Sequence, residues 1–325
     1  MNASVVVPTH NRRAVLARVL RLYGLQKLDV ERFEVVVVDD GSTDDTPSLF
    51  AALKTLEPRG GDPTLERHKG RILELRGGQL LLQTPDFSPK PLHLTYARIA
   101  KSGRSVARNI GIALAAAPLI IFADDDIFVE PEFVRKHLAV HLFNRRCVVT
   151  GRVIHTGSLE DPFSARWKLK DLNTACLATG NASVLKHAVV EAGMFDEGYT
   201  VYGWEDFDLG IHLKEHGLRS IRRPICGYHY EPSAVDFDPA EVYRKEKERG
   251  MTAVYFYKNH PLRWVKRFTL VESRAVRALV ALLGRNNWFF EKHRIRRFGG
   301  VAKLIVRYKG YFDGIAAGKE RYLIG

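Results

Sequence analysis

Cysteine is scarce in this sequence, and long hydrophobic runs are missing from it. The 325 residues include three cysteines, Cys147, Cys176 and Cys226, which are far apart and form no Cys-x-x-Cys pair. This spacing excludes a disulfide framework and a cysteine zinc site, so we expect buried free thiols. No run of about 18 apolar residues occurs, which argues against a membrane-spanning helix. The first residues carry no basic region before the first apolar run, so we expect no signal peptide and a cytoplasmic location.

Charge is distributed unevenly along the chain, although the formal net charge is +13. Residues 241–325 contain 20 Lys and Arg against 7 Asp and Glu, whereas the residues before them contain 30 of each kind. With 46% hydrophobic and 27% charged residues, the composition is that of a globular protein with one large core or two smaller ones. We therefore expect a globular domain at 1–238 and a basic, mainly helical extension at 239–325 that meets an anionic surface.

Three consecutive carboxylates, Asp124, Asp125 and Asp126, follow a short apolar run at 119–123. Such a run predicts a buried strand that ends at the edge of a sheet. Three adjacent aspartates cannot lie unpaired in a core, so they need open water or a cation. Alternation along a strand would place Asp124 and Asp126 on one side, and their oxygens suit Mg²⁺ or Mn²⁺ shared with substrate phosphates. A solvated acidic turn is the alternative, and this segment by itself leaves both open.

The first part of the chain alternates apolar strands with amphipathic helices. Residues 3–7 and 33–38 are β-branched runs, and apolar residues recur with helical spacing between 13 and 26. Strands that are apolar on both faces indicate an α/β fold with a parallel sheet covered by helices. Right-handed crossovers bring the carboxyl ends of these strands to one edge, where ligands bind. We also expect a helix from about residue 47, an insertion with a hairpin at 57–91, strands at 92–99, 147–153, 178–185 and from 219, and helices at 103–117 and 131–144.

Two arginines lie at the start of the predicted helix at 103–117. Arg104 and Arg108 follow a glycine at a helix N-terminus, where free backbone N–H groups favour anions. This combination suits a phosphate or a nucleotide. The alternative is an amphipathic helix whose arginines are only solvated, and these residues considered alone favour it.

A glycine-rich segment combines an aromatic ring with two acids. Gly203 and Trp204 precede Glu205 and Asp206, which we place at a helix N-terminus because the helix dipole favours ionised carboxylates there. Aromatic faces stack on sugar C–H groups while acids bind hydroxyls, so the segment suits a sugar-binding wall. The alternative is a helix capped by acids with Trp204 in the core. His229 follows another predicted strand, and considered alone it fits a structural histidine better than a ligand.

Five motifs occur in order along the chain: Val-Val-Pro-Thr-His-Asn-Arg at 6–12, Val-Asp-Asp-Gly-Ser-Thr-Asp at 38–44, Ala-Arg-Asn-Ile-Gly at 107–111, Asp-Asp-Asp at 124–126 and Gly-Trp-Glu-Asp-Phe-Asp-Leu at 203–209. In this order and spacing, residues 3–230 resemble the family 2 glycosyltransferases of GT-A fold. The resemblance implies a Rossmann-like nucleotide-binding sheet joined to an acceptor-binding half. It also implies a nucleotide-diphosphate sugar donor, with UDP- or dTDP-sugars expected, a divalent metal and inversion at the anomeric carbon.

The resemblance assigns donor-side roles to the matching residues. Asp39 would hold the edge of the base, with Asp40 nearby. Asp126 would be the direct metal ligand within the family's Asp-x-Asp pattern, together with Asp124, and His229 falls where some relatives place another metal ligand. The residues implied to line the nucleotide-sugar pocket are Pro8, Thr9, Asn11, Arg12, Asp39, Asp40, Arg104, Arg108, Asp124 and Asp125.

On the acceptor side, Glu205 and Asp206 match the family's acid pair, and Trp204 and Gly203 would contact the acceptor. Asp206 resembles the catalytic base, which removes the proton of the attacking hydroxyl, while Mn²⁺ or Mg²⁺ stabilises the departing diphosphate. The sequence departs from the family at Ile127, where many relatives carry a further aspartate. The segment at 57–91 also looks longer than usual, and both departures leave the donor sugar open.

Aromatic and basic residues alternate through 241–325, which suits a peripheral contact with the inner face of an anionic membrane and a lipid-linked acceptor. The Tyr-x-Gly-Tyr-x-x-Gly pattern at 308–314 is similar to the tails of bacterial relatives that act on surface polysaccharides. A helical cap packed on the catalytic domain is the alternative, and both stay open. No nucleic-acid-binding motif accompanies the charge, so we expect no nucleic acid partner.

The sequence thus predicts a metal-dependent, inverting enzyme that moves a hexose to a hydroxyl of a glycan or lipid-linked acceptor. The main alternative is a catalytically inactive binder of sugar nucleotides or glycans with the same fold. Two other enzyme classes fit less well. An aspartyl phosphatase needs a residue between the acids at 39–40, and a sugar-nucleotide nucleotidyltransferase needs a glycine-rich loop where 8–13 has none.

Overall fold

A computed structural model of the chain describes residues 2–28, 32–57, 60–81, 91–171, 175–231, 238–273, 278, 282 and 292–323. The chain divides into two compact units. Unit 1 comprises Met1–Glu197 and Asp206–Pro232, and unit 2 comprises Gly198–Glu205 and Ser233–Gly325. Unit 2 therefore includes a short loop from the middle of the sequence besides the C-terminal segment. The division into domains at 238 stays a prediction.

The described residues of unit 1 form a ten-stranded sheet in the order β3-β4-β5-β2-β1-β6-β9-β8-β10-β7. Four central strands, β5, β2, β1 and β6, are parallel, as predicted. Beyond β6, the strand β9 runs antiparallel to both neighbours, β10 is parallel to β8, and β7 is antiparallel to β10. The strands are β1 (Ala3–Thr9), β2 (Phe33–Asp40), β3 (Lys54–Thr55), β4 (Ile72–Leu81), β5 (Pro91–Ile99), β6 (Leu119–Phe122), β7 (Ile127–Val129), β8 (Cys147–Thr156), β9 (Ala182–Leu185) and β10 (Arg219–Tyr230).

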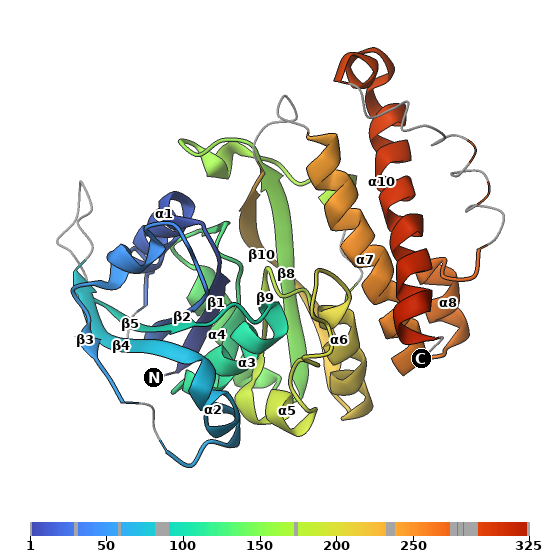
Figure 1. Cartoon of the computed structure of the whole chain (residues 1–325). Coiled ribbons are helices and arrows are strands. Elements are labelled where there is room, and N and C mark those ends of the chain that lie inside the picture. The colour runs from blue at the N-terminus through green and yellow to red at the C-terminus, as the bar shows by residue number, and fades with distance from the viewer. Residues whose placement is uncertain are drawn as a thin grey trace. The chain divides into compact units, whose positions relative to one another are not determined.

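Helices cover both faces of this sheet, which gives unit 1 two cores (Figure 1). Successive residues of β1 show why, because Val5 and Val7 belong to one core and Val6 to the other. The first core contains side chains of α1 and α4, and the second contains side chains of α2, α3, α5 and α6. These helices are α1 (Arg13–Gly24), α2 (Pro63–His68), α3 (Arg104–Leu114), α4 (Phe133–Phe143), α5 (Lys186–Glu191) and α6 (Glu205–Glu215).

Two predicted elements differ in the structure. Residues Thr46–Phe50 form a short 3₁₀ helix, so the helix expected after residue 47 does not extend further. The acidic segment is not one strand, because β6 ends at Phe122 and β7 begins at Ile127, with a turn between them. The insertion at 57–91 contains α2 and β4, and β4 pairs antiparallel with β5 as in a hairpin. Residues 82–90, which connect these strands, lie outside the described residues.

The described residues of unit 2 include the helices α7 (Pro239–Asn259), α8 (Arg263–Thr269) and α10 (Lys292–Tyr322). Glycines let α7 and α10 approach closely. A Cβ atom added to Gly250 of α7 would lie 1.9 Å from the Tyr311 carbonyl oxygen, and one added to Gly314 of α10 would lie 2.0 Å from the Lys247 carbonyl oxygen. Since Gly314 is four residues from Gly310 and from Gly318, all three lie on one face of α10. None of the described helices has the length and apolar character needed to span a lipid bilayer.

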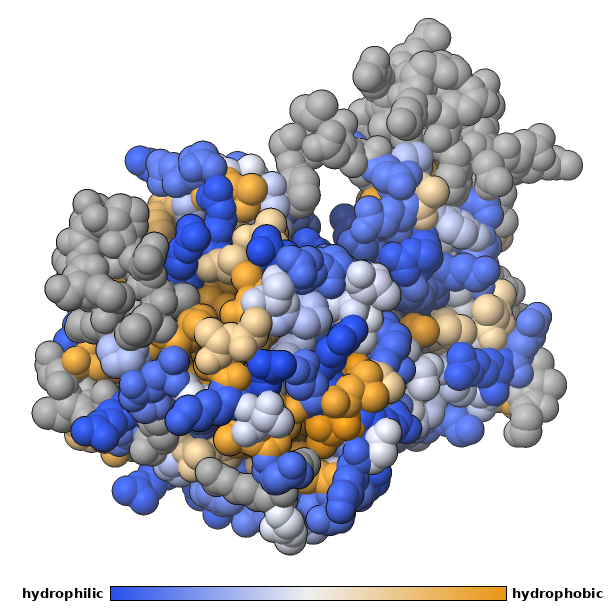
Figure 2. Space-filling model, turned by 60° about the vertical axis from the view of Figure 1, so that its left-hand side comes forward, coloured by the Kyte–Doolittle hydropathy of each residue, from blue (hydrophilic) through white to orange (hydrophobic). Residues whose placement is uncertain are grey.

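The surface drawn in Figure 2 is mainly hydrophilic, with hydrophobic residues in patches between the charged ones. Among the described large apolar side chains, Phe143 at the end of α4 is the most exposed, at 86%. Scattered exposed apolar residues of this kind are normal for folded proteins.

Candidate active site

The carboxyl ends of the parallel strands bring the N-terminal motifs and the three aspartates to one edge of the sheet. Thr9 ends β1 and pairs in register with Asp39 near the end of β2. The turn at 124–126 follows β6, which pairs with the other side of β1. Parallel strands with short connections place these groups together, and this edge is the usual ligand position of an α/β sheet.

Each aspartate of the turn has a different partner. Asp124 pairs with Arg108 at 3.1 Å, and Arg108 is almost completely buried. Asp125 accepts a hydrogen bond of 2.6 Å from the Thr9 hydroxyl. Because β6 has already ended at Phe122, strand alternation does not decide how these side chains point, and that part of the sequence argument is wrong. Burial, with the neighbouring charge of Asp126, raises the pKa of Asp125 to about 7.

Asp126 lies beside His229. From the sequence, His229 could be either a structural histidine or a metal ligand. The strands β7 and β10 pair antiparallel with Ile127 opposite His229, and the backbone N–H of Tyr230 donates to the Asp126 carbonyl at 2.9 Å. As a result His229 Nε2 lies 3.4 Å from Asp126 Oδ1. Arg12 approaches the other carboxylate oxygen at 3.8 Å. Burial opposes charge on both Asp126 and His229, but their attraction outweighs it, so the pKa of Asp126 is lowered and that of His229 is raised.

The groups around Asp126 fit a divalent cation. Asp126 Oδ1 is buried and accepts no hydrogen bond from the described residues, which is costly for a carboxylate unless another group satisfies it. A carboxylate oxygen beside an imidazole nitrogen is a suitable donor set for a metal ion such as Mn²⁺. Asp124, with 38% of its side chain exposed, is accessible at the same turn. These residues therefore fit the metal that the resemblance implied.

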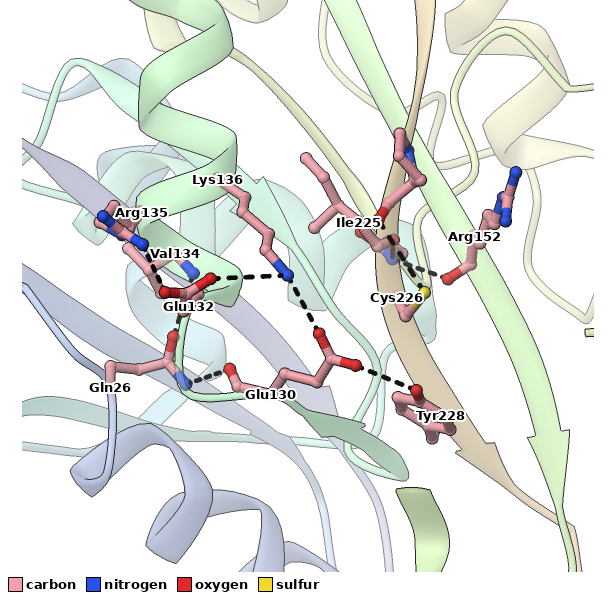
Figure 3. A network of polar contacts seen from close by, with 12 residues as sticks. Gln26, Glu130, Glu132, Val134, Arg135, Lys136, Arg152, Ile225, Cys226 and Tyr228 are labelled. Atoms are coloured by element: carbon pink, nitrogen blue, oxygen red, sulfur yellow. Dashed lines mark hydrogen bonds and ion pairs between the residues drawn. The ribbon is translucent and has the colours of Figure 1, made fainter. Parts of the chain in front are cut away.

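A half-buried polar network around Glu130 connects β7, which follows Asp126, to β10, which carries His229 (Figure 3). Gln26, just after α1, donates to the Glu130 carbonyl at 2.9 Å and accepts from the backbone N–H of Val134 at 3.0 Å. The Glu130 carboxylate pairs with Lys136 of α4 at 3.1 Å and accepts from the Tyr228 hydroxyl of β10 at 3.0 Å. Since Glu130 follows β7 directly, the network fixes β7 against β10 one residue from His229.

Asp39 and Asp40, the first acid pair, bind groups of the protein itself. Asp39 is fully buried, and it accepts hydrogen bonds from the Tyr96 hydroxyl at 2.9 Å and from the backbone N–H of Ser42 at 2.8 Å. Asp40 pairs with Lys101 at 2.8 Å and accepts from the backbone N–H of Ser102 at 2.6 Å. In this structure the two carboxylates support the loops after β2 and β5. The assignment of Asp39 to the edge of the base, with Asp40 nearby, stays a prediction.

The loop after β1 is tied to the loop after β2 through Asn11. Its side-chain oxygen accepts from the backbone N–H of Thr43 at 2.7 Å, and its own N–H donates to the Ser42 hydroxyl at 2.9 Å. Asn11 has a φ of 54°, a left-handed conformation that asparagine adopts more readily than most other non-glycine residues. Pro8, at the end of β1, is half-buried, and Arg104, the first residue of α3, is exposed.

The acid pair at 205–206 lies where the chain passes from unit 2 into unit 1. Glu205 is 6% exposed and accepts from the backbone N–H of Gly203 at 3.1 Å. Asp206, in the first turn of α6, is half-buried. Gly203 has a φ of 114°, which glycine adopts without steric cost, whereas the φ of 72° at Trp204 is strained for a residue with a side chain. Of the two acids, Asp206 is the more accessible.

Trp204 is part of the core of unit 2. Its ring is 7% exposed and stacks on Phe256 with 5.4 Å between centroids, and its indole N–H donates to the Arg249 carbonyl at 2.8 Å. This placement corrects the expectation of an open sugar-binding wall and agrees with the alternative of a core tryptophan. Trp167 of unit 1, by contrast, is 41% exposed, and the sequence argument did not consider it.

Several polar residues near the site were missed by the sequence argument. Tyr96 and Lys101 hold the acids at 39–40. His155 and Glu231 lie close to His229, and Asp171 pairs with His155. His155 lies near the end of a strand, as His229 does, and that shared position was the one signal available in the sequence.

Residues 4–71 and 83–191 match the model of Glycosyl transferase family 2. They make up more than half of the chain. The chain belongs to glycosyltransferase family 2. The family predicted from the five motifs is confirmed.

The chain is similar in sequence to several known proteins over part of its length. The chain is 27% identical over 292 residues to an uncharacterized glycosyltransferase, YfnE, of Bacillus subtilis, across 71% of this chain and 65% of YfnE. It is 28% identical to validoxylamine A glucosyltransferase of Streptomyces hygroscopicus subsp. jinggangensis, across 66% of this chain and 52% of that protein. It is 26% identical to chondroitin synthase of Escherichia coli, across 70% of this chain and 34% of the synthase. The chain therefore spans between one third and two thirds of these relatives.

Two solved structures share the fold of this family 2 glycosyltransferase. Mannosyltransferase PcManGT from Pyrobaculum calidifontis, in complex with GDP-Man and Mn²⁺, aligns with a TM-score of 0.56 at 16% identity, over 99% of this chain and 87% of that one. TarS of S. aureus aligns with a TM-score of 0.52 at 16% identity, over 99% of this chain and 55% of that one. The predicted GT-A fold is confirmed.

Proposed function

We propose that the chain is an inverting, metal-dependent glycosyltransferase that moves a sugar from a nucleotide-diphosphate donor to a hydroxyl of a glycan or lipid-linked acceptor. One observation carries the proposal. Asp126 presents a buried oxygen that accepts no hydrogen bond from the part of the chain that the structure describes, 3.4 Å from the His229 imidazole at the carboxyl edge of the sheet. The complex of PcManGT with GDP-Man and Mn²⁺ supports the pairing of a nucleotide sugar with a cation in this fold.

On the donor side, we assign binding to groups that the protein leaves accessible. Arg12 is 40% exposed and lies 3.8 Å from Asp126, so its positive charge is available to a phosphate beside the aspartates. Pro8 and Asn11 belong to the same loop, and Arg104 begins α3. Arg108 holds Asp124 in position through their ion pair. The choice of UDP- or dTDP-sugar stays part of the proposal.

The cation, held by Asp126, Asp124 and His229, would neutralise charge on the departing diphosphate. Asp206 takes the proton of the acceptor hydroxyl as general base, because it is the more accessible acid at 205–206. Glu205 fixes the preceding loop through its hydrogen bond from Gly203.

The proposals for the acceptor and for the cellular location rest on the positive charge of residues 241–325. The excess of 20 Lys and Arg over 7 Asp and Glu in 241–325 favours an anionic partner, and we propose peripheral contact with the inner face of a membrane that carries a lipid-linked acceptor. Relatives named chondroitin synthase and validoxylamine A glucosyltransferase support a sugar-containing acceptor. A role in polysaccharide or cell-envelope synthesis is part of the same proposal.

The test is a thermal-shift panel of nucleotide sugars with and without Mn²⁺, followed by a donor-turnover assay. We expect one UDP- or dTDP-sugar to raise the melting temperature, and chelator or Asp126→Asn to abolish the shift. His187→Ala, an exposed change on α5, is the matched control. Stabilisation by a donor without any turnover to water or acceptor would favour the inactive binder instead.

A further inference from the structure

Two histidines lie side by side on neighbouring parallel strands. His155 of β8 is the register partner of His229 of β10, so both side chains point to the same face of the sheet. Their rings meet edge to face with 5.1 Å between centroids. Glu231 follows directly after the end of β10, two residues from His229. One potential ligand atom from each of His155, His229 and Glu231 lies within 4.8 Å of the other two.

His155 is oriented by a buried acid. Its Nδ1 lies 2.7 Å from Asp171 Oδ1, and the Asp171 side chain is 1% exposed. Asp171 also accepts a hydrogen bond of 2.7 Å from the backbone N–H of Lys168, which fixes the carboxylate. Because an ionised carboxylate only accepts, Nδ1 carries the proton and Nε2 keeps its lone pair for a ligand. A carboxylate behind a histidine is the usual support of a metal-binding imidazole.

His229 connects this pair to the aspartate turn. Its Nε2 lies 3.4 Å from the buried Asp126 oxygen that accepts no hydrogen bond from the described residues. Asp126 offers a carboxylate oxygen beside His229, and Glu231 offers one close to both imidazoles. Mg²⁺ prefers oxygen ligands and retains its water, whereas imidazole binds transition-metal ions more strongly.

We propose that His155 and Glu231 complete the cation site of Asp126 and His229, and that two imidazoles make this site selective for a transition-metal ion such as Mn²⁺ over Mg²⁺. The inference rests on the proposed function, because it concerns the same cation. It assigns His155 as a metal ligand and Asp171 as the residue that positions it.

The experiment uses the full chain and metal ions alone, without any donor sugar. Electron paramagnetic resonance of free Mn²⁺ gives the dissociation constant, Mg²⁺ competition gives the selectivity, and nitrogen hyperfine coupling counts the bound imidazoles. We expect Mn²⁺ to bind at least about tenfold more tightly than Mg²⁺, with two nitrogens coupled. His155→Ala should leave one nitrogen, and both His155→Ala and Asp171→Asn should weaken Mn²⁺ binding about 10- to 100-fold. His187→Ala should bind as wild type, and melting in chelator shows that each variant is folded.

Wild-type protein with equal affinity for Mg²⁺ and Mn²⁺, or a nitrogen count unchanged by His155→Ala, would overturn the inference. The unmodified protein decides the selectivity, so a variant that fails to fold does not block the test. Sugar transfer with one coupled nitrogen would refute this inference and leave the proposed function standing. Two coupled nitrogens without binding or turnover of any nucleotide sugar would support the metal site and count against the proposed function.

Discussion

The edge of the sheet in unit 1 and the helix pair of unit 2 use their polar and small residues in opposite ways. At the edge, Asp126 keeps a buried oxygen that no described residue hydrogen-bonds, and His229 lies beside it. In unit 2, Gly250 and Gly314 bring α7 and α10 together until each backbone nearly touches the other helix. The sheet edge has a carboxylate oxygen that can still bind a ligand. The contact between α7 and α10 leaves no room for a side chain at these glycines.

Trp204 and Asp206, two residues apart in the sequence, differ in the same way. Trp204 belongs to unit 2 and is buried against Phe256, whereas Asp206 belongs to unit 1 and is half-buried. A substitution in the packed region should therefore change stability, and a substitution at the sheet edge or at Asp206 should change chemistry. Each prediction below tests that separation.

The largest effect is expected for Asp206→Asn. Loss of the general base should lower the transfer rate about 10²- to 10⁴-fold, with donor affinity nearly unchanged. The matched variant is Glu205→Gln, which keeps an oxygen to accept from Gly203 and should lower the rate less than about tenfold. Steady-state kinetics with a titrated donor measures both. A rate unaffected by Asp206→Asn would show that another group takes the proton.

Trp204→Ala should lower the free energy of unfolding by about 3 to 5 kcal/mol, because it removes a buried ring and its hydrogen bond to Arg249. Trp167→Ala should cost at most about 1 kcal/mol, since that ring is 41% exposed and contacts Arg152 at 6.0 Å. Denaturant titration compares the two variants. Equal losses would mean that burial does not distinguish these tryptophans.

Gly314→Ala and Gly300→Ala should change stability in opposite directions, although both lie in α10. The new Cβ at 314 would lie 2.0 Å from the Lys247 carbonyl, so the helices must separate at a cost of about 1 to 3 kcal/mol. At Gly300 no atom lies within 4 Å among the described residues, and alanine should stabilise the helix by up to about 1 kcal/mol. Thermal and denaturant unfolding show whether each substitution raises or lowers the free energy of unfolding. Destabilisation at both positions would remove the packing argument.

The smallest effect is an acid sensitivity of unit 1 at His137. Burial, with the nearby His141, lowers the pKa of His137 from 6.5 to about 3, against the opposing effect of its hydrogen bond with Asn181. The unfolded chain therefore binds the proton first, and stability falls as the pH drops below 6.5. At pH 5.5 this costs about 1.4 kcal/mol relative to pH 7.5.

His137→Gln should lose about 1.4 kcal/mol less than wild type between pH 7.5 and pH 5.5, whatever its stability at neutral pH. Denaturant midpoints at the two pH values measure this difference, and contributions from carboxylates cancel in the comparison. An equal pH dependence in both proteins would show that His137 is charged in the folded state.

Much of unit 1 follows from local pattern. The α/β class was predicted from the β-branched runs of β1 and β2, the helical spacing of α1 and the acids after β6. This was possible because residue alternation and apolar periodicity are local properties of the chain. The five ordered motifs gave the family, now confirmed by the match over residues 4–71 and 83–191.

The sequence by itself determined the type of sheet, the acidic edge and the family of this protein. Only the tertiary structure decided that Asp39 and Asp40 support loops, that Trp204 is buried, and that His155 lies opposite His229. These facts depend on strand register and on contacts between segments far apart in the chain. The physical reason is that a side chain's burial and partners come from what packs against it, which no local pattern records.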